Sequence, residues 1–103
     1  IFSNIVTIYR FHVTFLEELA PIQNNWSDDS QFIEKFYNMS PFLKFYTQYC
    51  SNYDNSISTL QLQKKTNPEF SKFLLAAQAN DRFKGTYITS YLIMPIQRIP
   101  RYE

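Results

Sequence analysis

Apolar side chains recur along this chain at steps of three and four residues, the spacing that places them on one face of an α-helix. The clearest case is residues 1–20, where polar side chains occupy the opposite face. Pro21 is expected to end this helix, because the residue before a proline is disfavoured in the α region. The predicted inward positions are Ile1, Ile5, Ile8, His12, Phe15 and Leu19.

The polar stretch 22–30 interrupts this spacing, and Asp28, Asp29 and Ser30 are candidate N-caps for a second helix over residues 32–37. Ser40-Pro41 then resembles a cap followed by proline at the first helical position, which would restart the chain in a new direction. From Phe42 the apolar spacing predicts one long helix. It would end near Lys64-Lys65, where two cations complement the carbonyl end of the helix dipole.

The last third of the chain is punctuated by prolines. Asn67-Pro68 repeats the pattern of cap and proline, and a short helix through Ala77 should follow. Residues 80–85 are expected to form a loop, Thr86 to cap a helix through Leu92, and Pro95 to open another one. The pattern therefore predicts an all-α protein with about six helical segments.

Composition supports this fold class. Of the 103 residues, 45% are apolar and 18% aromatic, which is enough for one buried core, while a single Gly argues against a turn-rich β-fold. Ten basic and nine acidic residues give a net charge of +1, too balanced for a nucleic-acid-binding protein. One cysteine suits a cytoplasmic setting. No apolar run approaches the ~20 residues that span a bilayer, so direct membrane insertion is not expected.

Candidate catalytic residues are few. One cysteine and one histidine cannot build a zinc site, and the single Gly rules out a Gly-rich phosphate loop. His12 lies within the apolar stripe of the first helix, where a packed, hydrogen-bonded role is favoured. Cys50 is expected to be a buried, inert thiol on an aromatic-rich helix. We therefore predict no covalent chemistry, no metal and no cofactor.

Two arginines are the remaining candidates for a binding surface. Arg98 and Arg101 are three residues apart, so on a helix they share one face, next to an apolar strip over residues 91–96. Such a pair can bind a partner's carboxylates, or it can tie helices together inside a bundle. The residues alone leave both roles open. A helical RNA-binding domain is disfavoured by the charge balance.

The segment 90–102 reads SYLIMPIQRIPRY. It resembles the signature of Dbl-homology (RhoGEF) domains, in which a serine-x-leucine-isoleucine run leads into proline, glutamine, arginine, a basic residue and tyrosine. Three further blocks resemble the family's helices in the same order: IFSNI at 1–5, the aromatic pattern from Phe42 to Leu60, and FSKFL at 70–74. The resemblance covers the whole chain.

This resemblance implies an elongated helical bundle that promotes guanine-nucleotide exchange on a Rho-family small GTPase of the Rho, Rac or Cdc42 type. It implies that Arg101 reaches the second switch region of the GTPase. Gln97 and Arg98 would lie on the same surface or brace it, and Ile99 and Tyr102 would pack inward. Nothing in the sequence selects one GTPase.

The resemblance also implies that residues 1–103 form a partial domain, lacking the family's first helix and its long C-terminal helix. A pleckstrin-homology domain is expected next to it in the parent protein. The expected location is cytoplasmic, with membrane recruitment left to other domains. The alternative is a scaffold or dimerisation domain with the Dbl-homology fold but without exchange activity.

Overall fold

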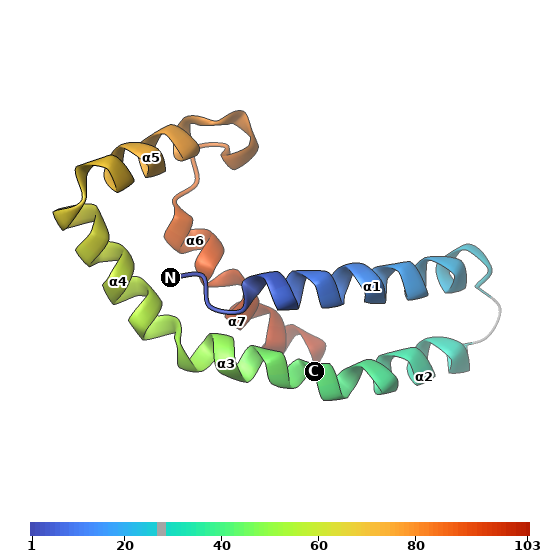
Figure 1. Cartoon of the computed structure of the whole chain (residues 1–103). Helices are drawn as coiled ribbons and strands as arrows, with labels where there is room; N and C mark the ends of the chain where they lie inside the picture. Colours follow the sequence, from blue (N-terminus) through green and yellow to red (C-terminus); the bar gives the residue numbers. More distant parts are fainter. Residues whose placement is uncertain (27–28) are drawn as a thin grey trace. The chain divides into compact units, whose positions relative to one another are not determined.

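The computed structural model of the protein describes residues 1–26 and 29–103, and in these ranges the chain contains helices and no strand (Figure 1). The predicted fold class, all-α, is confirmed. The chain divides into two compact units, an N-terminal unit of Asn4–Gln48 and a C-terminal unit of Ile1–Ser3 with Tyr49–Glu103. The division falls within α3, which spans Phe45–Ser51.

The N-terminal unit contains α1 (Ile5–Asn24), α2 (Asp29–Met39), the 3₁₀ helix η1 (Ser40–Lys44) and the start of α3. Helices α1 and α2 lie side by side and run in opposite directions (Figure 1). The predicted inner face of α1 is confirmed, because Ile8 is buried and the other predicted inward positions of the helix, Ile5, His12, Phe15 and Leu19, are half-buried. The apolar residues that flank this stripe are exposed, namely Val6, Tyr9, Val13 and Leu16.

Two polar contacts join α1 to α3. The side-chain amide of Asn4 donates to the carbonyl of Phe45 over 2.9 Å. His12 Nε2 lies 2.6 Å from the hydroxyl of Tyr46, and the two rings meet edge to face. The structural role predicted for His12 is thus confirmed, because its ring is partly buried and hydrogen-bonded within the helix packing.

The predicted end of the first helix at Pro21 is wrong, because α1 continues to Asn24. Proline cannot donate to the carbonyl of Glu17, but Glu17 is exposed and water can satisfy that group. The carbonyl of Pro21 accepts from the backbone N–H of Asn25 at 3.2 Å. The helix therefore continues for one further hydrogen-bonded turn, although the residue before a proline disfavours the α conformation. Asp28, a candidate cap of the next helix, lies outside the described residues.

The C-terminal unit contains α4 (Tyr53–Thr66), α5 (Pro68–Ala79), η2 (Asp81–Phe83), α6 (Ile88–Leu92), α7 (Met94–Arg98) and η3 (Ile99–Tyr102). Helices α4 and α5 meet at a corner at Asn67 (Figure 1). The most buried side chains of the unit are Tyr49, Ser56, Leu60 and Leu92. Leu60 is the most deeply buried of them, with 1% of its surface exposed.

The long helix predicted from Phe42 to Lys65 is divided in the structure. A 3₁₀ turn occupies residues 40–44, and Asn52 separates α3 from α4. At the second break the side-chain amide of Asn52 donates to the hydroxyl of Ser56 over 2.8 Å, and its side-chain oxygen accepts from the side-chain amide of Asn55 over 3.1 Å. The same contact satisfies the buried hydroxyl of Ser56.

Of the three helix starts predicted in the last third, those at Asn67 and Thr86 have opposite outcomes. Asn67 is extended and its side-chain oxygen accepts from the N–H of Phe70 over 3.0 Å, so the predicted cap is confirmed. Thr86 is not a cap: α6 begins at Ile88 without a side-chain cap. Lys84 and Gly85 both take positive φ, and the N–H of Thr86 bonds to the carbonyl of Phe83, so the turn still includes Thr86.

The prediction of a buried Cys50 is also wrong, because this thiol is exposed. Along α3 and α4 the buried positions Tyr49, Ser56 and Leu60 recur at steps of seven and four, and they define one face. Cys50 follows Tyr49 directly and is rotated about 100° from it around the helix. An aromatic-rich helix with a single buried face thus leaves this position in solvent.

Candidate functional site

The segment that carries the candidate arginines is shaped by two prolines. Pro95 has no N–H for the carbonyl of Tyr91, and Pro100 has none for the carbonyl of Ile96. The chain responds with two short helices, α7 and then η3, instead of one continuous helix. The predicted helix start near Pro95 is confirmed, since Pro95 stands in the first turn of α7.

All three predicted contact residues are exposed on this segment. Gln97 and Arg98 lie at the end of α7, and Arg101 lies in η3. A 3₁₀ helix has three residues per turn, so positions 98 and 101 fall on the same face. Ile99 and Tyr102 are half-buried, as expected for the inward side. We call the surface formed by Gln97, Arg98 and Arg101 the α7–η3 surface.

The two arginines of this surface differ in their surroundings. The guanidinium carbon of Arg98 lies 4.7 Å from the centre of the Tyr102 ring, which is a cation–π contact across one turn. Arg101 is exposed and makes no hydrogen bond or ion pair with any described residue. Arg98 is therefore held against Tyr102 of η3, whereas the charge of Arg101 is available to a partner.

A buried hydrogen bond lies behind this segment, and no pattern in the sequence indicates it. The hydroxyl of Tyr49 donates to the carbonyl of Leu92 over 2.8 Å, at the end of α6. Desolvation by burial, with smaller effects from Tyr53 and Cys50, raises the pKa of Tyr49 above its usual 10.0. Tyrosines at helical spacing predict a core, but spacing cannot show which carbonyl a hydroxyl will meet.

Charge in the C-terminal unit favours an acidic partner. This unit carries seven basic and four acidic residues, although the whole chain is nearly neutral. A surplus of one sign attracts and orients a partner of the opposite sign. The basic residues are Lys64, Lys65, Lys72, Arg82, Lys84, Arg98 and Arg101.

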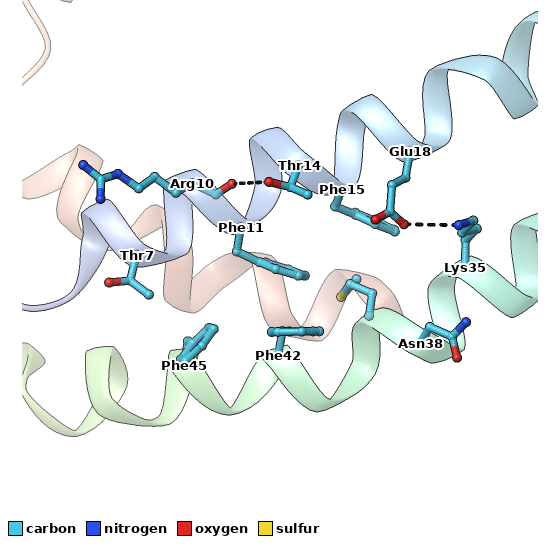
Figure 2. A pocket seen from close by; sticks show the side chains of 11 residues that line it. Thr7, Arg10, Phe11, Thr14, Phe15, Glu18, Lys35, Asn38, Phe42 and Phe45 are labelled. Atoms are coloured by element: carbon cyan, nitrogen blue, oxygen red, sulfur yellow. Dashed lines mark hydrogen bonds and ion pairs between the residues drawn. The ribbon is translucent and has the colours of Figure 1, made fainter.

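A groove of about 460 Å³ lies in the N-terminal unit between α1 and the chain from α2 to α3 (Figure 2). Its floor is aromatic: the rings of Phe11 and Phe42 stack with centres 4.9 Å apart, and Phe15 stacks on Phe11 at 6.2 Å. At its rim Lys35 forms an ion pair with Glu18 over 3.5 Å. This pair is about half exposed, so it contributes at most about 1 kcal/mol to holding α1 and α2 together.

The lining of the groove contains no histidine, cysteine or serine. Within residues 1–26 and 29–103 no cluster of three or more His, Cys, Asp or Glu side chains could hold a metal ion. None of the helices described there combines the length and apolar character needed to cross a bilayer.

Known proteins are similar to this chain over its whole length. The model of the RhoGEF domain family matches residues 1–103. The chain is 33% identical to the human FYVE, RhoGEF and PH domain-containing protein 2, and 31% identical to the mouse FYVE, RhoGEF and PH domain-containing protein 3, in each case over 100% of its length. No solved structure matches it significantly.

A third relative is the Guanine exchange factor for Rac 30 of Dictyostelium discoideum, 41% identical over 99% of the chain. The chain spans only 16%, 14% and 6% of the lengths of the human, mouse and Dictyostelium relatives. Each of these proteins is therefore much longer than the region that it shares with this chain.

Proposed function

Because this chain belongs to the RhoGEF domain family, we propose that it is part of a guanine-nucleotide exchange factor for a Rho-family small GTPase. The family regulates GTPases and makes or breaks no covalent bond in doing so. The name of the Dictyostelium relative, a guanine exchange factor for Rac, supports a partner of this class. The chain would act by stabilising the nucleotide-free GTPase.

The observation that carries this proposal is the exposure of the α7–η3 surface. Arg101 has no acidic partner among the described residues and stands on the unit with the basic surplus. Its guanidinium can bind a carboxylate with two parallel hydrogen bonds. We assign it to the second switch region of the GTPase. Gln97 would contact the same region, and Arg98, held on Tyr102, would brace the surface.

The energetics of exchange place a bound on what this surface can do alone. An exchange factor binds the nucleotide-free GTPase in preference to the loaded form, and by reciprocity it weakens nucleotide binding by the same factor. Moving a two-state equilibrium from 1:99 to 99:1 requires about 5.5 kcal/mol of differential binding. A charged hydrogen bond contributes about 1.5–3 kcal/mol. Further contacts must therefore supply the remainder.

We assign those contacts to parts of the domain outside residues 1–103. The chain would then be a partial RhoGEF domain, completed by a first helix and a long C-terminal helix. The two FYVE-containing relatives carry a PH domain by name, which supports a pleckstrin-homology domain in the parent protein. Sequencing the complete gene product and assigning its helices tests this organisation.

The test of the proposed activity is release of a fluorescent guanine nucleotide from a panel of Rho-family GTPases by the intact protein. We expect the wild type to accelerate release from at least one member. Arg101→Glu should lower that rate at least about tenfold, because a charged contact is lost and a repulsive one is introduced. Arg82→Glu is the matched control, since Arg82 is exposed in the same unit but outside the α7–η3 surface.

The result of this assay can contradict the proposal in two ways. No acceleration by the wild type with any Rho-family GTPase would remove the activity. Equal rates for wild type and Arg101→Glu would remove the role of Arg101. Circular dichroism spectra of the three proteins must agree, so that a rate difference does not arise from unfolding.

A scaffold without exchange activity is the second candidate, and one observation favours it. The exposed residues Val6, Tyr9, Val13 and Leu16 alternate at steps of three and four along α1, the spacing of a seam that packs against another helix. A scaffold that dimerises through this seam would be a dimer in light scattering and inactive in nucleotide release. Arg101→Glu would leave that dimer unchanged.

A further inference from the structure

One buried hydrogen bond fixes the position from which the α7–η3 surface begins. The hydroxyl of Tyr49 donates to the carbonyl of Leu92 over 2.8 Å, and the two residues are only 3% and 5% exposed. Tyr49 belongs to the turn of α3 that is part of the C-terminal unit. The contact thus joins two segments of that unit which are far apart in the sequence.

The acceptor lies at a break in helical structure. Leu92 ends α6, and Ile93 separates it from α7. Pro95 has no N–H to donate to the carbonyl of Tyr91. The junction retains the backbone bonds from Ile93 to the carbonyl of Thr89 and from Gln97 to the carbonyl of Ile93. Tyr49 adds a contact from outside the segment to this interrupted stretch.

We propose that Tyr49 is a positioning residue for GTPase binding, which acts by fixing the α6–α7 junction and so the direction in which Arg101 is presented. This inference rests on the proposed function. Helices α7 and η3 are only five and four residues long and follow the junction directly, so we expect a change at Leu92 to alter the orientation of Arg101. Contacts that hold a binding group in its productive orientation are as necessary as the group itself.

Burial supports this role. An ionised hydroxyl could not donate, and the raised pKa of Tyr49, caused first by desolvation, keeps the group protonated. Tyr91 offers a comparison within the same unit. Its hydroxyl donates to the carbonyl of Phe83 over 3.2 Å, but this contact is exposed and water can replace it. Of these two contacts, the one made by Tyr49 is buried and lies at the junction of α6 and α7.

The test is a double-mutant cycle in the intact protein, with the dissociation constant for a nucleotide-free Rho-family GTPase as the measured quantity. Tyr49→Phe keeps the ring and removes the donor, and we expect it to weaken binding about tenfold. In a protein that already carries Arg101→Ala, most of this effect should disappear, because both changes act on one contact. Tyr91→Phe is the matched control and should leave the affinity unchanged.

A merely structural role for Tyr49 gives a different pattern. In that case Tyr49→Phe would lower the melting temperature, and its effect on affinity would simply add to that of Arg101→Ala, with no coupling between the two substitutions. Hydrogen exchange provides a second readout: Tyr49→Phe should speed exchange of the amides in residues 93–102 and leave those of α4 unchanged. If Tyr49→Phe does not fold, Tyr49→4-aminophenylalanine replaces it as a weaker donor, and a smaller coupling of the same sign is expected.

Two failures are distinguishable. If the wild type neither binds nor exchanges any Rho-family GTPase, the proposed function is wrong and the inference falls with it. If the wild type is active while Tyr49→Phe binds equally well, or shows a purely additive loss with Arg101→Ala, the proposed function stands and the role of Tyr49 is wrong.

Discussion

Leu60 should carry a large share of the stability of the C-terminal unit, and the chain offers its own control for this prediction. Leu60 in α4 is 1% exposed, whereas Leu62 on the same helix is 57% exposed. Leu60→Ala removes buried methyl groups and leaves a cavity, which costs about 2–5 kcal/mol. Leu62→Ala removes the same atoms at a solvent-exposed position, so its free energy of unfolding should stay within about 0.5 kcal/mol of that of the wild type.

The assay is urea denaturation of the intact RhoGEF domain followed by circular dichroism. With a slope of about 1.5–3 kcal/mol per molar urea, a loss of about 3 kcal/mol lowers the midpoint by about 1–2 M. The slope itself should not change. Equal losses for the two variants, or a loss below about 1 kcal/mol for Leu60→Ala, would refute the assignment of Leu60 to the core.

Three further outcomes are expected. Asn67→Ala should lower the free energy of unfolding by about 1 kcal/mol in urea denaturation, because the N–H of Phe70 loses its cap, while Asn67→Asp should keep most of it. The free energy of unfolding should fall as pH rises above 10, because the raised pKa of Tyr49 lets the folded protein keep a proton that the unfolded chain releases. Denaturation curves from pH 9 to 11 should show this decrease, and Tyr49→Phe should make the dependence of the free energy of unfolding on pH less steep. Cys50 is exposed, so iodoacetamide should alkylate its peptide in native protein at a rate close to that in denatured protein, as measured by mass spectrometry.

Helix positions could be predicted from the sequence wherever local chemistry decides them. The apolar spacing of α1 placed Ile8 on its inner face, and Asn67 before proline predicted a cap that the structure contains. Both signals depend on residues within one or two turns of each other. Two features of the α7–η3 surface could be predicted for the same reason, namely the helix start at Pro95 and the shared face of Arg98 and Arg101.

Other features depend on contacts that spacing does not describe. Pro21 lies within α1 because an exposed carbonyl can be left to water, and the predicted long helix is divided at Asn52. The burial of Tyr49 against Leu92 joins positions 43 residues apart, and no local pattern indicates it. The exposure of Cys50 follows from which face of α3 is buried, which only tertiary packing decides.

The central claim is that the side chain at position 101 touches the GTPase. Site-specific photo-cross-linking tests it most directly, with a photoreactive amino acid placed at position 101 of the intact protein, and at position 82 for comparison. We predict an adduct with the nucleotide-free Rho-family GTPase from position 101 only, which disappears when GDP and Mg²⁺ are added. An active protein that forms the adduct from position 82 but not from position 101 would contradict the account.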